Sequence, residues 1–283
     1  MWREFFAYTV NFSGADALVA ASQRDPVSAV YVPLSVRIHE DSDYEIVKIN
    51  YVATDDRVFV RLVDNTSGRR LHRGVPVLSL IAGRSQIVTA FALGDVQLNS
   101  PAFNAHILPT PYIIAAGAEL IVEAADFSNA TNTVRITFLG NKIRPGRAPY
   151  DKDRTIGEQE YKYRQYFSWP FESGAIVANG TQPGTIVVDR DADILIRKLM
   201  AFRTGVCTVE LADAGARDRM WQDRPIHIDN YFGNGSFPNI LPSPRFLSRG
   251  VGISVSIADL SAAANRVSLL LEGEKLFVAP PTG

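Results

Sequence analysis

The stretch "ILPTP" at residues 107–111 occurs a second time, as "ILPSP", at residues 240–244. Prolines two positions apart fix φ at both sites and remove two backbone donors, so each motif predicts a stiff, extended segment. The two motifs lie 133 residues apart (240 − 107 = 133). One such motif means little, but two raise the question of whether the surrounding sequence is doubled as well.

Matched residues run through most of the chain at nearly constant spacing. Before residue 84 the spacing is 150 (191 − 41) or 149 (213 − 64), and the matched pairs are Asp41 and Asp191, Asp43 and Asp193, Lys48 and Lys198, Asp64 and Asp213, Pro76 and Pro225, and Gly83 and Gly233. After residue 106 the spacing is 133, and the pairs include Gly117 and Gly250, Asp126 and Asp259, Ser128 and Ser261, Gly140 and Gly273, and Lys142 and Lys275. The sequence therefore predicts a tandem duplication of one domain.

The change of spacing places 17 extra residues (150 − 133) in the first copy, between Gly83 and Leu108. We predict a first copy at residues 1–144 with an insertion at 84–105, a linker at 145–162 rich in proline, glycine and charge, and a second copy at 163–283. Each copy is long enough to bury a core of its own, which distinguishes it from the short unit of a solenoid.

Apolar and polar residues alternate with a period of two in most of both copies, as in "VRITFLG" at residues 134–140 and "GISVSIAD" at 252–259. This period is typical of half-buried strands. Each copy is predicted to be all-β, with about eight strands at roughly ten-residue spacing, which favours a β-sandwich of the jelly-roll type. An immunoglobulin-like sandwich also fits the strand count, although the single cysteine excludes its Cys–Trp–Cys pattern.

The charge balance argues against a polyanionic partner, because 29 Lys and Arg nearly equal 30 Asp and Glu. We therefore expect neither nucleic acid nor a membrane surface as a partner. Cys207 is the only cysteine, so an intramolecular disulfide and a cysteine zinc cluster are excluded. The N-terminus lacks the apolar run of a secretory signal, and the longest apolar run, "IVTAFALG", is too short to span a bilayer. A soluble chain made in the cytoplasm is the expectation.

Residues that could carry chemistry are few. None of the four histidines lies at metal-ligand spacing from another, so no metal or other cofactor is predicted. Asp41 and Asp43, and their counterparts Asp191 and Asp193, would each face one side of a strand, as calcium ligands or a glycosidase pair require. The competing interpretation, which we favour, is that aspartates at a strand entrance end a turn and protect an edge. We predict no catalytic residue.

Two segments distinguish the first copy from the second and are candidates for contacts with a neighbour. The insertion is apolar enough to pack but is absent from the second copy, and the chain opens with an aromatic arm, "MWREFF". Either segment can dock on another subunit or simply cover its own domain. The candidate interface residues are Trp2, Phe5, Phe6, Ile87, Val88, Phe91, Leu93 and Phe103.

The order of motifs resembles that of a group of tailed-bacteriophage virion proteins. It runs from an aromatic opening strand ("FFAYTVNF", "YFSWPF") through Asp-x-Asp, "DNTSGRRL", Val-Pro-Val and Leu-Pro-x-Pro to "VRITFLGNKI". The resemblance spans nearly all of both copies. The first copy matches better, because the second replaces "SGRRL" with "GARDRM" and "FLGNKI" with "LEGEKL".

The resemblance implies small jelly-roll modules that coat heads or build neck and tail parts, with no catalytic residue. The expected partners are then further copies of the chain and other virion proteins, such as major capsid, portal or tail proteins, and the expected location is the virion. Two other functions are possible from the residues alone: a glycan-binding β-sandwich with Trp169 or Trp221 as an aromatic platform, and a glycosidase with two carboxylates in a cleft.

Overall fold

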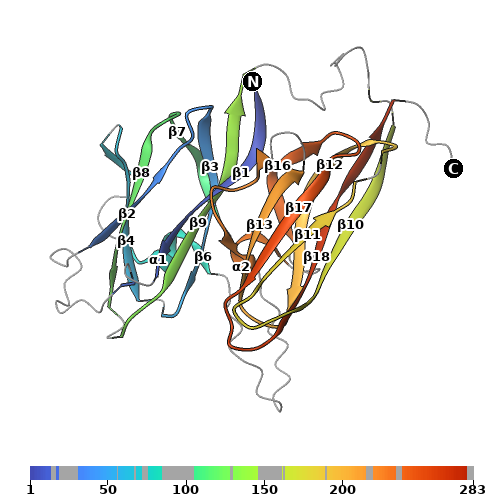
Figure 1. Cartoon of the computed structure of the whole chain (residues 1–283). Coiled ribbons are helices and arrows are strands. Elements are labelled where there is room, and N and C mark those ends of the chain that lie inside the picture. Colours follow the sequence, from blue (N-terminus) through green and yellow to red (C-terminus); the bar gives the residue numbers. More distant parts are fainter. Residues whose placement is uncertain are drawn as a thin grey trace.

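A computed structural model gives the positions of residues 1–13, 17–18, 31–55, 57–66, 68–71, 76–84, 105–127, 130–145, 161, 163–188, 190–214, 219–233 and 238–278. Residues 85–104 of the predicted insertion and most of the predicted linker lie outside these described residues. Strands dominate the described chain, so the all-β prediction is confirmed (Figure 1).

The N-terminal sandwich consists of two sheets. The first contains, in spatial order, β1 (Trp2–Phe12), β9 (Val134–Arg144), β3 (Asp43–Ala53) and β7 (His106–Ile114), with the short parallel β6 (Gly83–Arg84) also paired to β3. The second contains β2 (Val32–Arg37), β8 (Glu119–Asp126), β4 (Val58–Asp64) and β5 (Arg69–Arg70).

The C-terminal sandwich repeats this arrangement, except for the short strands β6 and β15 (Ile226–His227), which each occur in one half only. Its first sheet contains β10 (Tyr163–Ile176), β18 (Asn265–Phe277), β12 (Asp193–Arg203) and β16 (Asn239–Leu247). Its second contains β11 (Thr181–Ile186), β17 (Gly252–Asp259), β13 (Cys207–Ala214) and β14 (Arg219–Met220), with β15 also paired to β13.

In each half the first four strands alternate between the two sheets, as do the last three, and the first strand pairs with the last. This is the jelly-roll order, so the jelly-roll interpretation holds over the immunoglobulin-like one. The strands form where apolar residues recur at every second position: β4 and β17 both alternate buried and half-buried side chains along their length. Buried side chains from both sheets meet in each core.

Two one-turn helices, α1 (Leu78–Ile81) and α2 (Ile228–Tyr231), occupy matching places before β6 and β16. Among the described residues, no helix has the length and apolar character needed to cross a bilayer.

The Leu-Pro-x-Pro motifs lie on β7 and β16, each at the end of its sheet, as predicted. The ladder between β3 and β7 passes from the pair Ile46–Tyr112 directly to Lys48–Ile107, so residues 108–111 pair with nothing in β3. The ladder between β12 and β16 skips residues 241–244 in the same way. The prolines therefore stand where the sheet requires no backbone donor.

The same irregularity explains the matched glycines on the neighbouring strand. β3 carries a bulge between Ile46 and Lys48, and the bulge brings its backbone against β9. A Cβ on Gly140 would lie 1.9 Å from the Glu45 carbonyl oxygen, and one on Gly273 would lie 2.0 Å from that of Leu195. Only glycine fits these positions without moving the backbone.

The predicted turn glycines are also as expected. Gly117 and Gly250 precede matching strands with φ of 73° and 74°, in the left-handed region that favours glycine. In the matched Asp-x-Ser turn of the C-terminal sandwich, the backbone N–H and hydroxyl of Ser261 donate to the carboxylate of Asp259. Ser128 lies outside the described residues.

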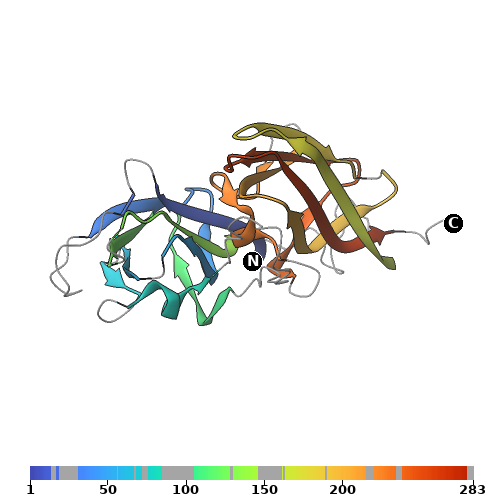
Figure 2. The same ribbon diagram turned by 90° about the horizontal axis from the view of Figure 1, so that it is seen from below.

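The two sandwiches stand side by side and meet along β1, whose outer face turns toward the C-terminal half (Figures 1 and 2). The N-terminus lies near this junction (Figure 1). The strands β1, β9 and β3 of the first N-terminal sheet are thus covered by their own partner sheet on one face and contacted by the second domain on the other.

Candidate functional site

Asp41 and Asp191 each form an ion pair with a lysine of the last strand of their own sandwich. The Asp41 carboxylate lies 3.1 Å from Nζ of Lys142 and 2.8 Å from Arg144, and that of Asp191 lies 3.0 Å from Nζ of Lys275. Burial opposes ionisation of Asp41, but the hydrogen bonds and charges of Lys142 and Arg144 outweigh it and hold its pKa below the ordinary value. These aspartates therefore neutralise buried lysines.

Asp43 and Asp193 anchor the turn that leads to the matched glycines. The Asp43 carboxylate accepts the backbone N–H of Ala116 at 2.9 Å, and that of Asp193 accepts the N–H of Arg249 at 2.7 Å. The two members of each acidic pair thus have separate structural partners, in the same way in both sandwiches. Within the described residues, no group of three or more His, Cys, Asp and Glu side chains is placed to hold a metal ion.

The remaining titratable candidates lie in separate places, with His227 and Cys207 buried. Burial lowers the pKa of His227 well below the ordinary value, and burial, with the charge of Lys142, lowers that of His39. Burial raises the pKa of the Cys207 thiol to about 12, so this cysteine is a core residue rather than a nucleophile. His106 lies at the start of β7, and His72 falls outside the described residues.

Both tryptophans considered as glycan platforms are buried. Trp169 is 3% exposed, and Trp221 is fully buried with its indole N–H donated to Asp213 at 2.6 Å. A stacking platform must present its ring to a sugar, so the expectation that either could serve is wrong. Both rings instead belong to the core of the C-terminal sandwich.

The aromatic arm forms the start of β1 and is largely covered by its own chain. Phe5 and Phe6 are 0% and 2% exposed, and Trp2 is half-buried. Phe6 points into the N-terminal core, whereas Phe5 points into the core of the C-terminal sandwich. The other candidate interface residues, Ile87, Val88, Phe91, Leu93 and Phe103, lie outside the described residues.

The junction between the sandwiches has a backbone component. The outer edge of β1 pairs with the segment around Gln222: the N–H of Ala7 donates to the Trp221 carbonyl, and the N–H of Asp223 donates to the Ala7 carbonyl, both at 3.2 Å. The N–H of Thr9 donates to the Asp223 carboxylate at 3.1 Å. A free strand edge is thereby closed by the second sandwich.

The apolar component of the junction comes from side chains of the N-terminal sandwich, with the half-buried Ala105 at its margin. Phe5, Ala7 and Leu139 are fully buried and join the core of the C-terminal sandwich. The Phe5 ring stacks on that of Tyr231 of α2, with the centroids 5.7 Å apart. The two cores are in effect bridged, which favours a single rigid body over two independently moving domains.

Charged groups complete the junction. Arg245 of β16, 1% exposed, lies 2.7 Å from the Glu4 carboxylate and 2.9 Å from that of Asp213. Glu4 also pairs with Arg219 and, at 3.1 Å, with Arg144. Breaking a buried network of this kind is strongly destabilising, because the remaining partners stay buried without compensation.

Lys48 and Asn230 add hydrogen bonds between the sandwiches. The Lys48 ammonium donates to the Ile240 carbonyl of β16 at 2.7 Å. The Asn230 side-chain amide donates to the Thr137 hydroxyl at 3.3 Å, and the Asn230 backbone carbonyl accepts from the Asn50 side-chain amide at 3.4 Å.

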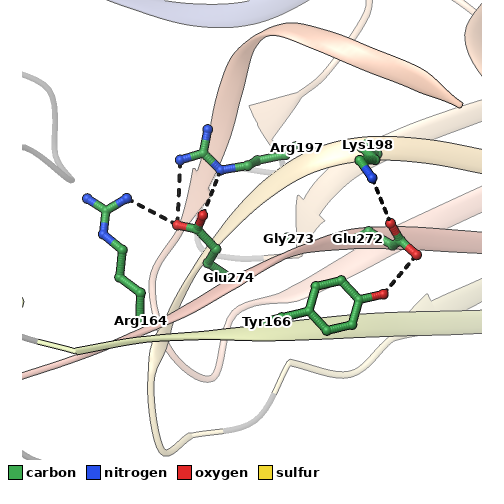
Figure 3. A pocket seen from close by; sticks show the side chains of 7 residues that line it. All are labelled: Arg164, Tyr166, Arg197, Lys198, Glu272, Gly273 and Glu274. Atoms are coloured by element: carbon green, nitrogen blue, oxygen red, sulfur yellow. Dashed lines mark hydrogen bonds and ion pairs between the residues drawn. The ribbon is translucent and has the colours of Figure 1, made fainter.

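In the C-terminal sandwich, a shallow pocket of about 240 Å³ lies on the outer face of the sheet that contains β10, β18 and β12 (Figure 3). Glu274 lies between Arg164 and Arg197, 3.1 Å from each, while Glu272 accepts the Tyr166 hydroxyl at 2.8 Å and lies 3.4 Å from Lys198. The hydrogen bond to Glu272 raises the pKa of the Tyr166 phenol. This is a solvated face of paired charges.

No family model and no curated protein matches the chain. Among solved structures, the major capsid protein P2 from bacteriophage PM2 is 14% identical over 99% of this chain and 100% of its own, with a TM-score of 0.23. The VP2 subviral particle of infectious bursal disease virus is 10% identical over 91% of this chain and 75% of its own, with a TM-score of 0.26. The tandem CBM22 domains of Paenibacillus barcinonensis Xyn10C are 10% identical over 98% and 94%, with a TM-score of 0.17. Likenesses this low leave the function to be argued from the residues themselves.

Proposed function

We propose that this chain is a non-enzymatic structural protein of a bacteriophage virion, present in symmetric copies on the capsid or at the neck or tail. The observation that carries the proposal is the duplicated use of Asp41, Asp43 and their counterparts. In both sandwiches, the residues best suited to catalysis or calcium binding have structural partners instead. One aspartate pairs with the matched lysine of its own sandwich, and the other accepts a backbone N–H of the matched turn. Polar residues that serve the same structural role in both sandwiches are consistent with a structural protein rather than an enzyme.

The rigid junction supports the same proposal. A chain whose two domains share buried apolar and charged contacts transmits load as one body, whereas a two-domain enzyme commonly places its site in a mobile cleft. The motif order shared with tailed-bacteriophage virion proteins adds the virion as the location, with synthesis in the bacterial host cytoplasm. Other virion proteins and further molecules of this chain are the proposed partners.

Within the virion, we place the contact with neighbours on the insertion at residues 84–105. Phe5 and Phe6 are already buried by their own chain, so the aromatic arm offers at most Trp2. Deleting residues 86–104 is expected to leave the sandwiches folded and to abolish incorporation into particles. Removing the last five residues, 279–283, is the matched control and should leave incorporation unchanged.

The test of the function itself is the composition of purified particles. Mass spectrometry of gradient-purified virions should find the chain in a fixed ratio to the major capsid protein. Its absence from particles, with the protein left in the lysate, would contradict the proposal. Hydrolysis of a polysaccharide by the wild-type chain that is lost in a folded Asp41→Asn, Asp43→Asn variant would instead make the acidic pair a catalytic site.

A further inference from the structure

β10 of the C-terminal sandwich is the counterpart of β1, residue by residue. Phe6 of β1 lies opposite Gly140, and Phe167 of β10 lies opposite Gly273. The inward contacts of these two phenylalanines are also the same: the ammonium of Lys142 lies 4.4 Å from the Phe6 ring centroid, and that of Lys275 lies 4.2 Å from that of Phe167. This alignment identifies which outward residues correspond.

The outward residues differ in a consistent direction. The registers place Tyr166 where the N-terminal sandwich has Phe5, Ser168 where it has Ala7, and Glu272 where it has Leu139. Among the described residues, Phe5, Ala7 and Leu139 are the fully buried residues that the N-terminal sandwich contributes to the core of its neighbour, and the half-buried Ala105 packs against the same core. Each of the three fully buried contacts is replaced by a hydroxyl or a carboxylate on the free face.

The matched lysine shows the same change of partner. Lys48 reaches across the junction to the Ile240 carbonyl, whereas Lys198 turns to Glu272 of its own sheet (Figure 3). Glu274, which holds Arg164 and Arg197, stands where the covered face has Asn141. The charges of the free face thus satisfy one another within a single sandwich.

The surface that would receive such a face is available on the N-terminal sandwich of another molecule. Leu80 of α1 is the counterpart of Asn230, whose side chain donates to Thr137 of β9. Ile107 of β7 is the counterpart of Ile240, whose backbone carbonyl accepts the Lys48 ammonium of β3. Leu80 is 72% exposed and Ile107 is 63% exposed. Docking the charged face on these apolar side chains would strip water from Glu272, Glu274 and their partners without new hydrogen bonds.

We propose that the outer face of the C-terminal sandwich, formed by Tyr166, Ser168, Glu272 and Glu274, is an end cap that excludes head-to-tail addition of a second molecule of this chain. Repeat arrays end in units with a polar outer face for the same physical reason. The cap limits the side-by-side arrangement to two sandwiches, so any symmetric assembly must use other surfaces. The inference concerns the two faces of the chain itself and does not depend on a place in a virion.

The test restores the residues of the covered face. The variant Tyr166→Phe, Ser168→Ala, Glu272→Leu is compared with the wild type by sedimentation velocity over a range of concentrations. We expect the variant to self-associate at least about tenfold more tightly than the wild type, with species that grow with concentration. Circular dichroism checks that the variant is folded, and Glu272→Leu alone provides a milder version of the same change.

The matched control adds Leu80→Asp and Ile107→Asp to the same variant, which should return it to wild-type sedimentation. Three results would overturn the proposal. The triple variant and Glu272→Leu, both folded, sediment like the wild type; the larger species persist in the presence of Leu80→Asp and Ile107→Asp; or the wild type itself forms species that Leu80→Asp alone abolishes.

Discussion

β1 and β10 hold the same place in two copies of one sandwich, yet one is almost wholly buried and the other is mostly exposed. Their inward residues make the same contacts, down to a lysine over the equivalent phenylalanine ring. Their outward residues have diverged, because only β1 faces another sandwich. The comparison teaches that the core preserves a duplicated fold, while the outer face of a single sheet decides whether the unit joins a neighbour or ends the array.

The largest expected difference between the covered β1 and the exposed β10 comes from removing Glu4, which pairs with three arginines at the junction. Glu4→Ala should lower the free energy of unfolding by about 3–5 kcal/mol, because Arg245 stays buried with one carboxylate fewer. Gln165 is the counterpart of Glu4 on the exposed β10, so Gln165→Ala should stay within about 0.5 kcal/mol of wild type. Chemical denaturation of both variants measures the difference. Equal effects would mean that the junction does not stabilise the chain.

Substitution of the matched glycines Gly140 and Gly273 tests whether the two sandwiches are equivalent at the bulge. Gly140→Ala and Gly273→Ala should each cost about 3 kcal/mol, at the upper end for overpacking, because the added Cβ would meet a backbone carbonyl in both cases. Thermal unfolding followed by circular dichroism is a sufficient measurement. A large loss in one variant and none in the other would show that the two bulges are not the same feature.

Asp223, which accepts a backbone N–H of the covered strand β1, makes the free energy of unfolding depend on pH. Burial raises the pKa of its carboxyl from 3.8 to about 6, against the opposing effect of Arg224. The folded chain therefore binds this proton more tightly than the unfolded chain. The resulting stabilisation is fully present below about pH 4 and is lost as the pH rises through about 6.

Asparagine cannot ionise, so Asp223→Asn should gain stability relative to the wild type as the pH rises from about 4 to 7, by an amount on the order of 1–3 kcal/mol. Denaturant unfolding of both proteins at the two pH values measures this difference. A difference that does not change with pH would place Asp223 in contact with water.

Much of the fold could be predicted from the sequence because it rests on local patterns that occur twice. Two Leu-Pro-x-Pro motifs, two glycines before matching strands and a period of two in both halves predict a duplicated all-β chain. A functional match that the sequence comparison did not reveal is the asparagine pair Asn132 and Asn265. These two residues, also 133 apart, each accept two backbone N–H groups from the turn after the third strand. Their side chains act on a distant turn, which spacing alone does not reveal.

The junction was the larger omission, although the sequence holds a signal for it. β1 is apolar at consecutive positions, "FFAY", and a strand that is apolar on both faces is covered on both faces. The counterpart in β10, "YFSW", interrupts the outward side with a hydroxyl. Sequence shows that the outward side of β1 must be covered, but it does not say whether its own chain or a second subunit covers it. That depends on where the second sandwich packs.

Hydrogen exchange at Ala7 and Ser168 tests the difference between the two faces most directly. The N–H of Ala7 is donated to the Trp221 carbonyl across the junction, and Ser168 holds the equivalent position on β10, beyond which no strand pairs within the described residues. Exchange in the isolated protein, followed by NMR, should be slow for the Ala7 amide and fast for the Ser168 amide. Fast exchange at Ala7, or protection of Ser168 equal to that of Ala7, would contradict the account.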